Sequence, residues 1–282
     1  MRKTILLGLA VLLSAATRTL AQTETIEYKD SPFVRQIRPD RSGQTITTNM
    51  LYPGQFQVDA TGNHHDPFGP TGALGRPAST GVLRVGFFNT IELRAAQSYV
   101  APLPGAGRTT PDGSPAAGPA GLAPLTLGAK FLASSTQNSR SQVVVLAEMT
   151  MQNGDKSFPN KILEPGGRLL VSQIIGNNFR LESNLGFRQR GFRAADTKLG
   201  QYLGTLALHG PLGRQFNFFA EGYTTWRQQQ KLAPSFTSGV SWRPYPGLRF
   251  DLTAGSSLSP ASAVPSKGLT VGGGLSFRLP LH

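Results

Sequence analysis

The feature that most constrains this chain is a period-of-two alternation of apolar and polar residues. In NFRLESNLGFRQ, residues 178–189, Phe179, Leu181 and Leu185 share one face, and charged residues occupy the other. This period is typical of a β-strand with an apolar and a polar face. In a soluble sandwich the apolar face would meet a protein core, whereas in an outer-membrane barrel it would meet lipid and the charges would lie inside.

The sequence predicts twelve strands of this kind. Most have about the 9–11 residues that cross a bilayer when tilted, and an even number is typical of single-chain bacterial barrels. Ten or fourteen strands remain alternatives. The predicted strands are residues 54–60, 81–88, 91–98, 124–133, 142–152, 167–175, 179–189, 201–209, 215–225, 235–243, 248–255 and 268–279.

Long and short connections alternate between these strands. The long ones are rich in Pro, Gly and Ser, as in VAPLPGAGRTTPDGSPAAGPAGLAP, and the short ones include GPLGR and PYPG. In an up-and-down barrel the periplasmic turns are short and the extracellular loops are long, whereas a sandwich has no reason to alternate. The fold class that we predict is therefore all-β, an up-and-down antiparallel transmembrane β-barrel.

The two faces of the predicted strands differ in charge. In most strands the apolar face carries no charge, as barrel stability requires, because a charge facing mid-bilayer costs roughly 2–4 kcal/mol. Only RLLVSQII, within 167–175, fits this parity poorly. We expect the residues of the polar face to line the lumen, either as a salt-bridged plug or as a polar passage that mildly favours anions. They are Arg84, Glu92, Arg94, Lys130, Glu148, Arg180, Glu182, Arg188, Glu221, Arg243, Arg249, Asp251 and Arg278.

Aromatic residues of the apolar face gather beside the short turns. Such residues form girdles at the membrane interface in barrels. We therefore predict one periplasmic ring of membrane-interface aromatics, made of Phe87, Phe131, Phe179, Phe216, Trp242 and Phe277.

The N-terminus predicts export. Arg2 and Lys3 precede an apolar run, and small residues end at Ala21, which is typical of a secretory signal peptide over residues 1–21. Residues 22–50 are polar with mixed charge and predict a periplasmic arm without an independent fold; whether it is disordered or forms a plug is left open. Residues 51–282 make up the predicted barrel, and no segment has the ~18 apolar residues of a spanning helix.

Composition narrows the function. The 282-residue chain has no cysteine, so an exported fold without disulfides is expected. The net charge of +13 comes from dispersed Lys and Arg residues, so we expect no nucleic-acid partner.

The sequence also resembles a known family. IRPDRSG, YPGQFQVDA, GVLRVGFFNTIELR and PYPGLRFDLTAG are similar to segments of the transporter family of the phenol meta-cleavage (MetA) degradation pathway, over residues 38–277. The resemblance implies an outer-membrane β-barrel that passes small aromatic or apolar compounds. Many barrels end on an aromatic residue that the insertion machinery reads, whereas here Phe277 is followed by RLPLH.

Catalytic chemistry is not indicated. His209 has no nucleophile and acid at a spacing that predicts a triad, and we expect a structural role. His64, His65 and Asp66 lie together in a loop without a further ligand, so we predict no metal site, no cofactor and no enzyme activity.

We therefore expect a channel or transporter in the outer membrane of a Gram-negative bacterium. The expected partners are outer-membrane lipid, lipopolysaccharide, the barrel-insertion machinery and a small-molecule substrate. Two alternatives stay open, a non-conducting structural or adhesive barrel and a secreted soluble β-sandwich that binds a ligand.

Overall fold

The computed structural model describes most of the predicted barrel and part of the segment before it. In the described part of the chain, no helix is long and apolar enough to cross a membrane. The described residues are 37–40, 44–64, 78–102, 120–136, 140–156, 158, 163–176, 178–191, 198–227, 232–245, 247–258 and 269–280. The strands are β1 (Gln55–His64), β2 (Ala78–Phe88), β3 (Ile91–Val100), β4 (Gly121–Leu122), β5 (Thr126–Ser135), β6 (Ser141–Thr150), β7 (Glu164–Ile175), β8 (Phe179–Gly191), β9 (Lys198–Pro211), β10 (Phe216–Arg227), β11 (Ala233–Tyr245), β12 (Leu248–Ser257) and β13 (Thr270–Pro280).

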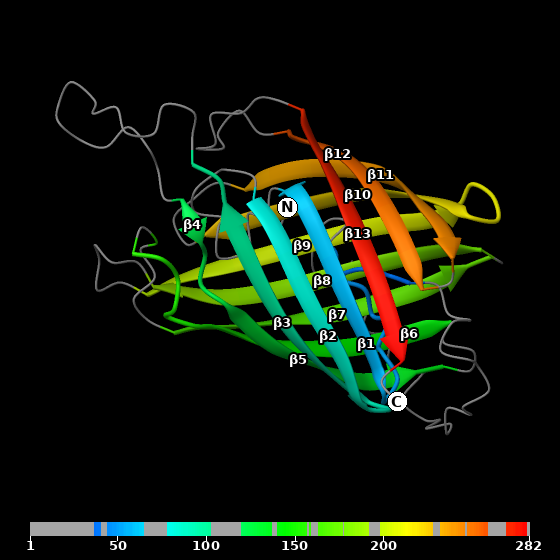
Figure 1. Ribbon diagram of the computed structural model, residues 1–282, viewed down its shortest axis with the longest axis horizontal. Helices are drawn as coiled ribbons and strands as arrows, with labels where there is room; N and C mark the ends of the chain where they lie inside the picture. The colour runs from blue at the N-terminus through cyan, green and yellow to red at the C-terminus, as the bar shows by residue number, and fades with distance from the viewer. Residues whose placement is uncertain are drawn as a thin grey trace, which may run out of the picture.

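The strands close into one antiparallel barrel (Figure 1). Each long strand pairs with its neighbours in chain order, and β1 pairs with β13, Gln55 opposite Pro280, so the sheet has no free long edge. The two-residue strand β4 only extends the end of β3. The closed ring therefore has twelve strands, which confirms the predicted fold class and count and excludes the soluble sandwich.

The outer face of the barrel is apolar. The apolar residues that alternate with the inward ones, such as Leu93, Leu127 and Val145, are exposed, as period-two alternation requires. One irregularity lies in β2, where the register shifts between Gly86 and Phe88. As a result Phe87 and Phe88 are both exposed and their rings meet edge to face at 4.5 Å. A bulge of this kind places two successive side chains on one face.

The segment before β1 lies inside the barrel, where its blue trace is seen behind β1 in Figure 1. We call residues 37–40 and 44–54 the inner segment. Residues 44–51 are all buried, and their partners come from inward faces on several sides of the ring. The sequence left open whether the arm predicted over residues 22–50 is disordered or forms a plug, and its described residues, 37–40 and 44–50, lie inside the barrel. Polar side chains suit this position because the inward face is polar.

A small apolar cluster joins the inner segment to the wall. Ile46 and Met50 pack against Val144, Leu146 and Leu170, which point inward from β6 and β7. Leu170 explains why RLLVSQII alternates poorly, because it is an apolar residue on the inward, otherwise polar face. It is buried beneath the inner segment, while Leu169 and Ile175 are exposed outside.

Candidate functional site

The predicted lumen residues lie on the inner side of the wall. Eleven of the thirteen are buried, and the other two, Arg180 and Arg243, are half-buried. Arg84, Glu92 and Lys130 are completely shielded from solvent. That these residues line a conducting passage stays a prediction, because many of them are paired with one another.

Four charged residues, which we call the Asp40 cluster, meet beneath the inner segment. Lys130 Nζ lies 2.7 Å from Asp40 Oδ2, and Arg84 Nη2 lies 2.7 Å from Glu92 Oε2. Cross contacts of 3.4 Å between Arg84 and Asp40 and 3.5 Å between Lys130 and Glu92 close the group. Asp59 lies 3.9 Å from Arg84, and Arg94 lies 4.0 Å from Asp40, so opposite charges are paired throughout this dry interior. Such pairing offsets the cost of burying charge.

The Asp40 cluster also holds the backbone of the inner segment. Arg84 donates to the carbonyl oxygens of Arg38 at 2.8 Å and Asn49 at 2.7 Å. Glu92 accepts a hydrogen bond from the backbone N–H of Leu51 at 2.8 Å. The cluster thus satisfies peptide groups that water would otherwise hydrate, so it stabilises this path of the chain through the lumen.

A second ion-pair group is centred on Glu148. Its carboxylate lies 2.9 Å from Arg94, 3.2 Å from Arg188 and 3.6 Å from Arg168. Arg168 also donates to the carbonyl oxygen of Gln44 at 3.1 Å. The inner segment is therefore bound to the wall by guanidinium groups on both sides.

Several inward residues of this network escaped the sequence prediction. Asp40 was assigned to the N-terminal arm, for which no contacts were predicted, and Arg168 belongs to the strand with unclear parity. Arg190 lies beyond the predicted end of its strand at residue 189, yet it pairs with Glu164 at 3.2 Å. The sequence could have predicted the inward direction of Arg190, because it lies two residues after Arg188 and therefore on the same face of the strand.

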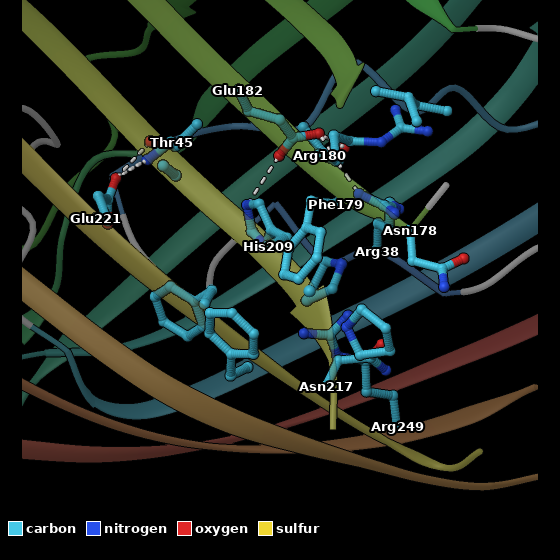
Figure 2. A pocket seen from close by; sticks show the side chains of 18 residues that line it. Arg38, Thr45, Asn178, Phe179, Arg180, Glu182, His209, Asn217, Glu221 and Arg249 are labelled. Atoms are coloured by element: carbon cyan, nitrogen blue, oxygen red, sulfur yellow. Dashed lines mark hydrogen bonds and ion pairs between the residues drawn. The ribbon is translucent and has the colours of Figure 1, made fainter. Parts of the chain in front are cut away.

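A cavity of about 250 Å³ lies between the inner segment and the wall of β7–β10, and Arg249 of β12 also lines it (Figure 2). Glu182 is central among its lining residues: it lies 3.1 Å from His209 Nε2, 3.0 Å from Thr47 Oγ1 and 3.7 Å from Arg38 Nη1. Asn178 and Asn217 also line it, so the cavity lies toward the short-turn end of the barrel. We call it the His209 cavity.

His209 shows how the strand register builds this cavity. It is opposite Arg180 on β8 and opposite Phe219 on β10, where the two rings stack at 5.9 Å. This arrangement suits the structural role expected for His209. Among the described residues, no group of three or more His, Cys, Asp or Glu side chains could hold a metal ion; His65 and Asp66 lie outside the described residues.

The six predicted interface aromatics all face outward. Their exposed fractions lie between 42% and 56%. They lie near the short connections or, for Phe277, near the end of β13, and some are stacked, Phe216 on Trp242 at 6.4 Å and Trp242 on Phe250 at 5.7 Å. Their contact with a membrane interface stays a prediction.

A second aromatic group marks the opposite end of the outer wall. Tyr202 stacks on Trp226 at 5.2 Å and contacts Phe187 at 5.3 Å. Trp226 and Phe216 share one face of β10, ten residues apart. At ~3.3 Å per residue and a tilt of about 40°, this separation corresponds to roughly 25 Å of barrel height, the height of the apolar band in membrane barrels.

The structure is similar to solved barrels from outer membranes. It matches the COG4313 outer membrane channel from Pseudomonas putida F1 with a TM-score of 0.60 and 10% identity, over 86% of this chain and all of that one. The chain has the fold of an outer-membrane β-barrel. The NanC porin matches with a TM-score of 0.47 and 7% identity, over 81% of this chain and 98% of that one. The KdgM porin matches with a TM-score of 0.46 and 9% identity, over 79% and 98%. The sequence itself matches no protein-family model and no curated protein.

Proposed function

We propose that this protein is a channel or transporter for small molecules in the outer membrane of a Gram-negative bacterium. The observation that carries the proposal is a closed barrel with an apolar outer wall, a charged interior, and a cavity leading into that interior from one end. The inner segment narrows the lumen. Export through the predicted signal peptide, insertion by the barrel machinery and contact with lipopolysaccharide belong to the same proposal.

We orient the barrel with its short turns toward the periplasm. The strand ends joined by residues 89–90 and 212–215, together with Tyr245 and Leu248, lie at one end of the ring, and the strand ends that flank the long connections lie at the other. Periplasmic turns are short in membrane barrels because the long loops face outside. The His209 cavity would then open to the periplasm.

Small aromatic or apolar compounds are the solutes that the resemblance to the phenol meta-cleavage family implies. The apolar part of the cavity lining supports this solute class. It includes Ile174, Ala207 and Phe219. The aromatic or apolar part of a solute would contact these groups.

Planar-bilayer conductance of the purified chain without residues 1–21 tests the proposal. We expect discrete current steps whose reversal potential in a KCl gradient indicates a mild preference for anions. Arg180→Glu, at the cavity, should shift selectivity toward cations, whereas Lys156→Glu, exposed in a long connection, should leave it nearly unchanged. Absence of current from correctly folded protein would contradict the channel.

The second candidate is a non-conducting structural or adhesive barrel. The observation that favours it is the Asp40 cluster, whose four side chains are fully shielded and bind the inner segment across the lumen. The same conductance measurement separates the two candidates. A silent barrel that still shows heat-dependent gel mobility, the signature of a folded barrel, would support this second candidate.

A further inference from the structure

The His209 cavity has a positively charged part and an apolar part. Arg38 and Arg180 contribute guanidinium groups to its lining, and Arg249 also lines it but is paired with Asp251 at 2.7 Å. Ile174, Ala207 and Phe219 contribute apolar groups. A ligand that satisfies both parts combines an anionic group with an apolar body.

The carboxylates of the cavity are engaged by other groups. Glu221 accepts a hydrogen bond from the hydroxyl of Thr45 at 2.6 Å (Figure 2). It also accepts one from the backbone N–H of Gln44 at 2.9 Å. Glu182 is bound by Thr47 and His209. Both carboxylates therefore hold the inner segment or a neighbouring strand, and Glu182 also forms an ion pair with an arginine of the cavity, Arg38 at 3.7 Å.

Arg38 is the least satisfied cation at this site. Its side chain is only 21% exposed, and within the described chain its guanidinium makes one ion pair, at 3.7 Å with Glu182, and donates no hydrogen bond. Arg180 lines the same cavity, so the two guanidinium groups repel each other. A bound anion would relieve this repulsion and accept the free donors of the guanidinium.

The size of the cavity sets the size of the ligand. An apolar cavity of about 150 Å³ holds a benzene molecule, so about 250 Å³ accommodates a body of that size together with a carboxylate. We propose that the His209 cavity binds small organic carboxylates, with Arg38 and Arg180 holding the carboxylate and Phe219 contacting the apolar body. The inference deepens the proposed function, on which it rests, by naming the solute class of the cavity.

Isothermal titration of the folded chain in detergent with benzoate tests this site without any current measurement. Benzamide is the matched neutral probe, and detergent alone is the blank. Benzoate should bind, and benzamide should bind at least about tenfold more weakly. Loss of one charge-assisted hydrogen bond predicts roughly ten- to hundredfold weaker benzoate binding in Arg38→Gln and in Arg180→Gln.

Arg214→Gln is the control, because Arg214 is exposed in the short connection between β9 and β10 and does not line the cavity. It should bind benzoate as the unmodified chain does. Arg38→Gln could loosen the inner segment, so Arg180→Gln, on the wall, provides the independent variant. The proposal is overturned if both folded variants bind benzoate normally, or if benzamide binds as tightly as benzoate. Benzoate binding by a barrel without current would support the site and reject the channel.

Discussion

The Asp40 cluster and the His209 cavity lie on either side of the same inner segment, and they treat charge differently. In the cluster, Asp40 has a lysine at 2.7 Å and an arginine at 3.4 Å, and no solvent reaches it. Two residues earlier in the chain, Arg38 has its nearest carboxylate at 3.7 Å and faces an open cavity. Charged side chains of this barrel stabilise the fold where they are closely paired, as Asp40 is. Where the nearest opposite charge is more distant, as for Arg38, they can bind a solute.

We expect the largest effect on the inner segment from Asp40→Asn. Removing one partner of a buried ion pair costs about 3–5 kcal/mol, because Lys130 and Arg84 would be left with excess positive charge. We expect the inner segment to leave the lumen more often. In a Thr48→Cys background, where the residue is buried and the chain has no other cysteine, an impermeant thiol reagent should react at least ~100-fold faster.

The matched control is Asp155→Asn in the same background, because Asp155 is exposed in a long connection. It makes the same chemical change outside the lumen and should leave the thiol at position 48 protected. Equal protection of that thiol in both variants would show that the Asp40 cluster does not hold the segment.

A smaller effect is expected from Gly86→Ala. A Cβ atom at Gly86 would lie 1.9 Å from the carbonyl oxygen of Tyr52, where the inner segment passes over β2. The backbone must move to relieve this clash, at a cost of about 1–3 kcal/mol in the free energy of unfolding. Urea unfolding in detergent measures this cost. Gly62→Ala is the control, because its Cβ atom would meet no described residue within 4 Å apart from its chain neighbours. If Gly86→Ala and Gly62→Ala unfolded with equal free energies, the inner segment would not be closely packed against β2 at Gly86.

The smallest effect is expected from Thr45→Val, on the cavity side. The substitution removes hydroxyl contacts to Glu221 at 2.6 Å and Thr205 at 2.7 Å, but keeps the backbone N–H contacts. In the Thr48→Cys background, a loss of about 1 kcal/mol predicts roughly fivefold faster labelling of the introduced thiol. Thr224→Val, whose hydroxyl has no hydrogen-bond partner among the described residues, is the control. If Thr45→Val accelerated labelling as much as Asp40→Asn does, the Asp40 cluster and the His209 cavity would not differ in how strongly they hold the inner segment.

The strands of this barrel could be read from the sequence, because alternation is a local property. Arg180, Glu182 and Arg188 point inward and Leu185 points outward wherever their strand pairs, since successive side chains of a strand face opposite sides. The short turns and the ring of aromatics follow from the same local patterns. The inward or outward direction of most wall residues was therefore determined by the sequence alone.

The partners of those residues were decided by the tertiary structure. Asp40, Glu92 and Lys130 are far apart in the chain, and no period connects them. Apolar and polar residues do not alternate along residues 44–51. This stretch is surrounded by the barrel wall, so its side chains are buried on every side rather than on one face. Its burial, the match of Leu170 to Met50 and the His209 cavity exist only once the ring has closed around it, since closure alone brings walls from distant strands to a single segment.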